Sequence, residues 1–269
     1  MKQSLMKVLE NKEIAHQIYQ IVIEPKTLQA NTNFEDFLNE WYPQPGQFFH
    51  IRVNDSNHPF LRRPISVHDF DPNTLRISMI YRVNGEGTKR LTQKTRGEIV
   101  DVLGPLGNGF PVSKTDKQQF LLIGGGIGIP PLYYLAKQLK HTGHQITTLL
   151  GFQSKQDIFL LEQFSSFGEI RVATMDGSLG SKGTVLDLIK EEEHWDLFYS
   201  CGPTAMMKAI QQKWMDKPIE GYLSLEERMG CAIGACYGCV VKVDQAVDLR
   251  GYKKVCADGP VFSFREVKL

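Results

Sequence analysis

The spacing of four cysteines near the carboxyl end constrains this 269-residue chain more than any other feature. Cys231, Cys236 and Cys239 form a Cys-x4-Cys-x2-Cys series, and Cys256 follows. This spacing is typical of loops that bind a plant-type [2Fe–2S] cluster through four thiolates. The loop is rich in glycine, so its backbone N–H groups can turn toward the sulfurs and offset the negative charge of a cluster. We therefore predict a [2Fe–2S] cluster bound by these four cysteines.

A structural Zn²⁺ held by the same four thiolates is the main alternative. Zinc-binding loops usually present Cys-x2-Cys pairs on both sides, whereas Cys256 stands alone in the sequence. Paired disulfides are a further alternative, and they need an oxidising compartment. The first 23 residues show neither an apolar signal core nor a small-residue cleavage site. We therefore expect a cytoplasmic protein with reduced thiols.

Charge and hydropathy exclude two classes of partner. Lys and Arg together number 31 against 30 for Asp and Glu, so the net charge is +1. Such a balance gives no basis for a nucleic-acid or anionic-membrane partner. No apolar run approaches the ~18 residues that a membrane-spanning helix needs. We expect neither nucleic acid nor a membrane to be a partner.

Residues 1–112 are predicted to form an antiparallel β-barrel or sandwich. Short runs rich in β-branched and aromatic residues occur at 16–23, 47–53 and 75–81. Pro, Gly and Asn bound these runs, as is typical of strands joined by turns. The polar stretch 111–117 is the expected boundary with the next segment.

Residues 113–226 are predicted to form a Rossmann-like α/β domain. Apolar strand candidates at 119–123, 146–150, 170–174 and 196–200 alternate with helix candidates at 130–140, 185–192 and 204–215. This alternation favours a parallel sheet with crossover helices. Residues 227–269 hold the cysteines, with strand candidates at 239–243 and 260–264. The predicted fold class is thus a multidomain α+β protein with a small C-terminal [2Fe–2S] domain.

Two motifs in the first segment suggest a flavin site. Arg63, Pro64, Ile65 and Ser66 could hold a pyrophosphate and the edge of a flavin, because a guanidinium matches phosphate oxygens geometrically. The sequence Gly-x-Gly-Thr, ending at Gly87-Thr88, could offer free backbone N–H groups to an anion. Each motif alone could be an edge strand or a simple turn. Together they favour a flavin with a diphosphate, FAD rather than FMN.

Two motifs in the second segment suggest a nucleotide site. Gly124, Gly125, Gly126 and Gly128 lie between an apolar strand and a helix, where nucleotide pyrophosphates bind. The sequence Cys201-Gly202-Pro203 ends the last predicted parallel strand, so it should face the same ligand. The alternatives are a tight glycine connection and a buried cysteine at a strand end. Ser154 and Lys155 follow a strand at a place where a 2′-phosphate could lie, so NADP stays possible beside NAD.

The order of these motifs resembles that of the ferredoxin–NADP⁺ reductase superfamily, over residues 10–225. With the cysteine series added, the whole chain is similar to the electron-transfer subunits of class 1B dihydroorotate dehydrogenases. Phrases around residues 45–48, 61–66, 104–110 and 256–262 carry this resemblance. It implies FAD binding by Arg63, Pro64, Ile65, Ser66, Ile80, Tyr81, Arg82, Gly87 and Thr88. It also implies NAD at the glycine run and at Cys201-Gly202-Pro203, with catalytic roles expected for Ser66 and Cys201.

The resemblance further implies a partner. The other subunit of such enzymes carries FMN and oxidises dihydroorotate, and a two-plus-two heterotetramer is expected. Electrons would pass from that FMN to the [2Fe–2S] cluster, to FAD and to NAD⁺. No dihydroorotate site is evident in this sequence, which suits a subunit. Ile65 departs from the superfamily pattern, which has a tyrosine there that stacks on the flavin.

Two other functions stay open from the sequence. The first is the electron-transfer subunit of another NAD(P)H oxidoreductase, of the sulfhydrogenase or ferredoxin:NADP oxidoreductase type. The second is a redox-sensing module that binds the cofactors without turnover. The first would differ only in its partner, and the second would lack NADH:acceptor activity.

Overall fold

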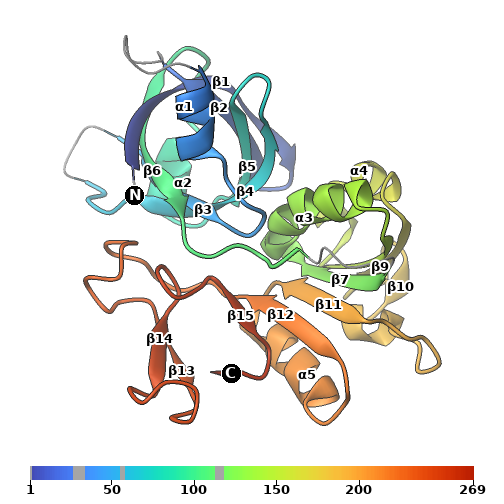
Figure 1. Cartoon of the computed structure of the whole chain (residues 1–269). Helices are drawn as coiled ribbons and strands as arrows, with labels where there is room; N and C mark the ends of the chain where they lie inside the picture. Colours follow the sequence, from blue (N-terminus) through green and yellow to red (C-terminus); the bar gives the residue numbers. More distant parts are fainter. Residues whose placement is uncertain (1, 27–33, 55–57, 113–117) are drawn as a thin grey trace.

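The computed structural model describes residues 2–26, 34–54, 58–112 and 118–269. These residues form a barrel, a mixed sheet with helices and a small cysteine-bearing unit (Figure 1). The greater part of the predicted boundary stretch, 113–117, lies outside the described residues. The domain limits at 112 and 226 therefore stay a prediction.

Six antiparallel strands close the predicted barrel in the order β1-β2-β5-β4-β3-β6. The strands are β1 (Lys2–Ala15), β2 (Ile18–Pro25), β3 (Phe48–Arg52), β4 (Arg63–Asp71), β5 (Arg76–Arg82) and β6 (Ile99–Leu106). Two helices accompany them, α1 (Phe34–Trp41) and α2 (Glu86–Leu91). The antiparallel barrel is thus confirmed.

The two faces of the barrel wall have different roles. Phe49 of β3 pairs with Ile65 of β4, and both side chains pack in the barrel core. Their neighbours Phe48 and Ser66 also pair, and they lie on the outer face because successive side chains alternate across a strand. Phe48 packs in a second core that extends into the rest of the molecule. The outer face of β3 and β4 therefore looks toward the other two units.

A seven-stranded sheet forms the second unit, in the order β10-β9-β8-β7-β11-β12-β15. Its strands are β7 (Gln119–Gly125), β8 (Gln145–Phe152), β9 (Glu169–Thr174), β10 (Ser181–Lys182), β11 (Leu197–Cys201), β12 (Glu220–Ser224) and β15 (Val261–Ser263). All neighbours are parallel except β12 and β15. The connections include the helices α3 (Pro130–His141), α4 (Leu161–Ser165) and α5 (Thr204–Trp214), with short 3₁₀ turns η1 (Gly126–Gly128), η2 (Lys155–Asp157) and η3 (Val185–Leu188). The predicted parallel α/β arrangement is confirmed.

The helix predicted over 185–192 is wrong in type and length. Val185–Leu188 forms a single 3₁₀ turn, closed by a reciprocal capping box between Thr184 and Asp187. Ile189 then takes an extended conformation with φ −79° and ψ 117°, which ends the helix. A capping box satisfies the first backbone N–H groups, but it does not extend a helix for which packing gives no further support.

The cysteine-bearing segment contributes to two sheets. Its own three strands, β14 (Tyr252–Lys254), β13 (Val240–Val243) and β16 (Val267–Lys268), form a small antiparallel sheet in that order. Strand β15 instead pairs antiparallel with β12 at the edge of the large sheet. In addition, Gln211 of α5 donates to the carbonyl of Val267 at 2.7 Å. The small unit is therefore joined to the seven-stranded sheet by backbone pairing.

Direct contacts also join the barrel to the other units. Helix α3 packs against β4, where Lys137 forms an ion pair of 2.8 Å with Asp69. Asn108, which follows β6, reaches the cysteine-bearing segment, and its backbone N–H donates to the Gly259 carbonyl at 2.6 Å.

No helix in the described part of the chain is long and apolar enough to cross a bilayer.

Candidate functional site

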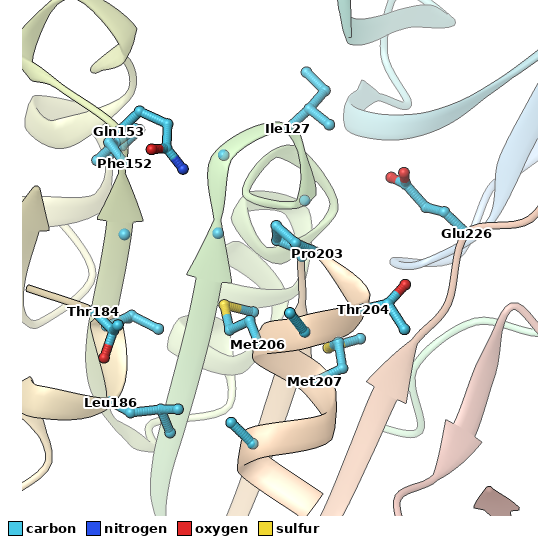
Figure 2. Close-up of a pocket in the computed structure, with 18 of the residues that line it drawn as sticks. Ile127, Phe152, Gln153, Thr184, Leu186, Pro203, Thr204, Met206, Met207 and Glu226 are labelled. Carbon is cyan, nitrogen blue, oxygen red and sulfur yellow. The ribbon is translucent and has the colours of Figure 1, made fainter. Parts of the chain in front are cut away.

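A cavity of about 590 Å³ lies at the carboxyl ends of β7, β8 and β11 (Figure 2). The strand ends of an open α/β sheet are the usual position for a nucleotide, because neighbouring loops separate there. Six residues of the cavity wall come from the sequence-predicted set: Arg82, Gly125, Gly126, Gly128, Gly202 and Pro203. The barrel thus supplies Arg82 to a cavity built mainly by the large sheet and its connections, to which the cysteine-bearing unit adds Val241 and Leu269.

The predicted glycines have different structural roles. A Cβ at Gly128 would lie 2.5 Å from the backbone of Cys201 and Gly202, so the two strand–helix turns pack without side chains between them. Gly124 packs against Ile129 and Leu132, and it does not line the cavity. At Gly126, the nearest atom to an added Cβ is a guanidinium nitrogen of Arg82, at 3.8 Å. Gly126 therefore leaves the floor of the cavity open beneath Arg82.

Cys201 ends β11 but its side chain does not line the cavity. The residue is 1% exposed and belongs to the core of the large sheet. Burial raises the pKa of the Cys201 thiol, and the nearby Glu226 carboxylate raises it further. The sulfur therefore stays protonated at neutral pH, and its catalytic role stays a prediction.

Glu226, which sequence reasoning did not single out, lies on the cavity wall after β12 (Figure 2). Glu226 is an exposed residue, yet the protein around its carboxylate desolvates the charged form, and this desolvation raises its pKa. A carboxyl group with a raised pKa in a cleft is a frequent feature of functional sites. No local sequence motif marks Glu226 as a site residue. Its position becomes evident only in the fold, which brings it near Cys201.

The loop after β8 carries an acidic residue into the cavity. Asp157 lines the wall, and its carboxylate accepts a hydrogen bond of 2.9 Å from the Ser154 hydroxyl. Ser154 is thereby engaged inside the 3₁₀ turn. The backbone N–H of Lys155 donates to the Ser178 hydroxyl at 2.8 Å. The loop considered for a 2′-phosphate thus presents a carboxylate to the cavity.

The structure brings the two predicted flavin motifs together. An added Cβ at Gly87 would lie 2.1 Å from Nε of Arg63, so the guanidinium of β4 rests directly on the start of α2. Arg63 also donates to the carbonyl of Arg62 at 3.2 Å. Thr88 accepts a hydrogen bond of 2.7 Å from the Asn84 N–H, which holds the turn before α2. A side chain at position 87 would displace the Arg63 guanidinium, so Gly87 is what allows the two motifs to form this shared cradle.

The other residues implied by resemblance lie around this cradle with different orientations. Ile65 and Tyr81 place their side chains in the barrel core, and the Tyr81 hydroxyl donates to Asn11 at 3.0 Å. Ile80 packs in the core of the large sheet. Arg82 points to the cavity, and its Nε is buried with no hydrogen-bond partner among the described residues. An unpaired buried guanidinium nitrogen suits a bound anion such as a dinucleotide phosphate.

Backbone N–H groups surround the cysteine sulfurs as predicted from the glycine-rich loop. Cys231 Sγ accepts from the N–H of Cys236 at 3.3 Å and from that of Ile233 at 3.5 Å. Cys256 Sγ accepts from Gly234 at 3.1 Å. Cys239 Sγ accepts from the Cys256 N–H at 3.4 Å. Such bonds favour the thiolate form that a metal cluster needs.

Cys231 interacts with Cys236 and Cys256 with Cys239, and Cys256 also interacts electrostatically with Cys231. In the described ranges, no three His, Cys, Asp or Glu side chains converge on a point that would hold one metal ion. Four thiolates are the ligand number of a [2Fe–2S] cluster and also that of a structural Zn²⁺. The donor set therefore fits a [2Fe–2S] cluster.

The pairs differ in exposure and in acidity. Cys236 is exposed, whereas Cys239 and Cys256 are buried. Burial opposes ionisation of Cys231, but backbone N–H donors outweigh it and lower the pKa of the Cys231 thiol to about 7. Burial raises the pKa of the Cys256 thiol to about 12. One pair thus faces the surface, and the other faces the interior.

Comparison with known proteins agrees with this architecture. Residues 226–268 match the iron–sulfur cluster binding domain of dihydroorotate dehydrogenase B, and residues 122–212 match the oxidoreductase NAD-binding domain. A solved chain of an NADH-dependent reduced ferredoxin–NADP oxidoreductase has a TM-score of 0.82 and 31% identity, covering 98% of this chain and 90% of that one. A flavohemoglobin from Malassezia yamatoensis shares the fold, with a TM-score of 0.63 and 16% identity over 81% of this chain and 58% of its own.

Curated relatives extend the match over the full length. The dihydroorotate dehydrogenase B (NAD⁺) electron transfer subunit of Geobacillus sp. (strain WCH70) is 47% identical, covering 100% of both chains. The subunit of the same name from Bacillus pumilus (strain SAFR-032) is 45% identical over 100% of this chain and 99% of its own. With its barrel, strand-end cavity and four-cysteine loop, the chain therefore belongs to the family of dihydroorotate dehydrogenase B (NAD⁺) electron transfer subunits.

Proposed function

We propose that this chain carries electrons from the FMN of a dihydroorotate dehydrogenase catalytic subunit to NAD⁺, using a [2Fe–2S] cluster and FAD. The observation that carries the proposal is the direct connection of three sites in one fold. The four-cysteine loop is joined to the sheet through β15 and to the barrel through Asn108. The barrel in turn supplies Arg82 to the nucleotide cavity.

We propose that the outer face of the barrel holds FAD. Arg63, packed on Gly87, would bind phosphate oxygens, and Arg82 would use its unpaired Nε for the same purpose. Ser66 lies on the outer face, where its hydroxyl can reach a flavin edge. Pro64, Ile65, Ile80, Tyr81 and Thr88 would shape the cradle, and the buried side chains of Ile65, Ile80 and Tyr81 leave only their backbone for the cofactor.

We propose NAD rather than NADP as the nucleotide in the cavity. The Asp157 carboxylate on the wall would repel a 2′-phosphate but can accept a hydrogen bond from a ribose hydroxyl. The Ser154 hydroxyl already donates to Asp157, so it is not free to bind a phosphate. Gly125, Gly126, Gly128, Gly202 and Pro203 line the part of the cavity that would receive the pyrophosphate.

When bound, the cluster supplies single-electron transfer and the flavin couples it to hydride transfer with the nicotinamide. The chain orients these groups and excludes water. Glu226, on the wall next to the end of β11, would orient the nicotinamide amide by accepting a hydrogen bond. Cys201 behind the wall would keep that region apolar, since its thiol is buried and uncharged.

We propose that the catalytic partner docks on the cluster rim, which consists of Ile233, Cys236 and Tyr237. Ile233 is 48% and Tyr237 53% exposed, and Cys236 is exposed as well. Exposed apolar residues beside a redox site suit a protein partner, because apolar burial stabilises the complex and brings the two centres close. A two-plus-two assembly in the cytoplasm is the proposed form of the enzyme.

The first test is anaerobic purification, followed by a visible spectrum with iron, sulfide, zinc and flavin analysis. We expect flavin bands with a broad iron–sulfur shoulder, and about two irons and one FAD per chain. Added NADH should bleach the flavin bands. A colourless protein that contains zinc and takes up no FAD would remove both cofactor assignments.

A further inference from the structure

Lys254 joins the two cysteine-bearing segments of the chain. The residue ends β14, two positions before Cys256. Its Nζ donates to the Gly234 carbonyl at 2.7 Å, in the loop that carries the other three cysteines. The same ammonium lies 3.9 Å from the ring centroid of Tyr237, within the range of a cation–π contact. The Lys254 side chain thus reaches from the Cys256 segment to two residues of the opposite loop, Gly234 and Tyr237.

The backbone of Lys254 closes the turn that presents Cys256. Its carbonyl accepts from the N–H of Asp258 at 2.8 Å and from that of Ala257 at 3.2 Å. Its own N–H donates to the Asp258 carboxylate at 2.6 Å. The residue that anchors one cysteine by its backbone therefore anchors the opposite loop by its side chain.

Gly234 links this anchor to a sulfur atom. The N–H of Gly234 donates to Cys256 Sγ at 3.1 Å, while its carbonyl accepts from Lys254. Its φ of +80° lies in the left-handed region that glycine adopts readily. Fixing the carbonyl holds the residue in this conformation, and thus keeps its N–H directed at the sulfur. Hydrogen bonds to cluster sulfurs are among the main determinants of cluster potential.

The electrostatic surroundings of the Lys254 ammonium differ from those of its neighbour Lys253. Lys253 forms an ion pair with Glu266, so a carboxylate compensates its charge. No carboxylate lies within ion-pair distance of the Lys254 ammonium among the described residues, and its contacts are a carbonyl and a ring. A positive charge beside a cluster stabilises the reduced state, which carries one more negative charge. Position 253 thus offers a matched control for position 254.

We propose that Lys254 is a positioning residue that orients the Gly234 N–H toward Cys256 and raises the reduction potential of the cluster. The inference rests on the proposed [2Fe–2S] assignment of the four cysteines. It adds a residue outside the cysteine series, whose ammonium contacts the Gly234 carbonyl and the Tyr237 ring. Its effect should appear in the potential of the cluster and leave NADH oxidation by FAD unchanged.

The test is a redox titration of the cluster in the wild type and three variants, with the reduced cluster monitored by electron paramagnetic resonance. Lys254→Met keeps the aliphatic stem and removes the ammonium, Lys254→Arg keeps the charge, and Lys253→Met is the control. We expect Lys254→Met to lower the equilibrium constant for cluster reduction about tenfold, equal to a potential about 59 mV lower for a one-electron couple. Lys253→Met should match the wild type, and Lys254→Arg should lie nearer to it than Lys254→Met.

Several results would overturn the inference. One is a Lys254→Met potential equal to that of the wild type, and another is a Lys254→Arg potential as low as that of Lys254→Met. If Lys254→Met binds no iron, Lys254→Gln, which keeps an N–H donor, is titrated with the same expected direction, and an unchanged potential again overturns the inference. A wild type without a two-iron signal would instead contradict the cluster assignment itself.

Discussion

Glu226 occupies the cavity wall at a cost to folding. Its pKa is raised because protein desolvates the carboxylate, so the fold disfavours the ionised form. Below the pKa of the unfolded chain, near 4.3, the group is protonated in both states and carries no penalty. As pH rises through the higher pKa of the folded state, stability is lost. Groups that reduce stability in a cleft are often held there for binding or catalysis.

Replacing this carboxylate should separate stability from function. We expect Glu226→Gln to raise the melting temperature at pH 8 and to leave it nearly unchanged at pH 4, as measured by thermal unfolding. We also expect NADH-dependent dye reduction to fall about tenfold in Glu226→Leu, which removes the acceptor that Gln keeps, the size of one lost orienting hydrogen bond of about 1.4 kcal/mol. Glu220→Gln, at the exposed start of β12, is the control. A Glu226→Gln variant no more stable than wild type at pH 8 would contradict the desolvation argument.

Residue-level prediction is most direct where chemistry is encoded locally. The cysteine spacing indicates a thiolate loop, and its N–H···S bonds follow from the small residues within it. The roles of Glu226 and Lys254 depend on partners distant in sequence, so no local motif reveals them. Cys201 was placed at its strand end from sequence, but whether its sulfur faces the ligand depends on packing behind the strand.

Among the elements, the contact between β4 and α3 joins the barrel to the sheet through a buried histidine. His68 Nδ1 lies 3.3 Å from the Pro130 carbonyl, and its ring packs on Tyr133 with centroids 4.5 Å apart. Burial lowers the pKa of His68 to about 4, although the nearby Asp69 carboxylate opposes the shift and Lys137 supports it. The histidine is therefore neutral in the folded protein at neutral pH.

This element contact should weaken in acid. The unfolded chain takes up the proton near pH 6.5, whereas the folded chain does so only near 4, so stability is complete above 6.5 and is lost as pH falls toward 4. We expect a loss of about 3 kcal/mol at most from this group. His68→Gln should flatten the pH dependence of denaturant unfolding, and His141→Gln, at the exposed end of α3, should not. Part of the loss should persist, because burial also lowers the pKa of His50 to about 4. Equal slopes in His68→Gln and wild type would rule out this explanation.

Elements with a clear helical or alternating pattern of apolar residues were predictable from the sequence. Elements whose form depends on tertiary contacts were not. Helices α3 and α5 and the central strands agree with their apolar patterns to within a few residues. Strand β1 was not predicted, because charged and amide side chains on its exposed face obscure the alternation. The predicted strand at 260–264 exists as β15, but its place at the edge of the large sheet depends on pairing with β12.

At the scale of the whole molecule, the cluster rim is the proposed contact with the catalytic subunit. We expect Ile233→Arg to weaken binding to the purified FMN-containing partner at least tenfold, because a charge would be desolvated in an apolar contact. Leu5→Arg is the matched control, since Leu5 is 49% exposed on β1 of the barrel and Ile233 is 48% exposed. Analytical ultracentrifugation of the mixed subunits gives both affinity and stoichiometry. Equal weakening by both variants would remove the rim as the specific docking site.

The fastening of the cysteine segment by β15 and Asn108 also determines how electrons can travel inside the chain. Many redox proteins carry their centre on a tethered domain that swings between donor and acceptor, so their turnover depends on linker length and solvent viscosity. Here the segment is paired to a neighbouring strand on one side and hydrogen-bonded to the barrel on the other. We therefore expect the fold itself to set the gap that an electron must cross, without a diffusive search by a mobile arm before each transfer.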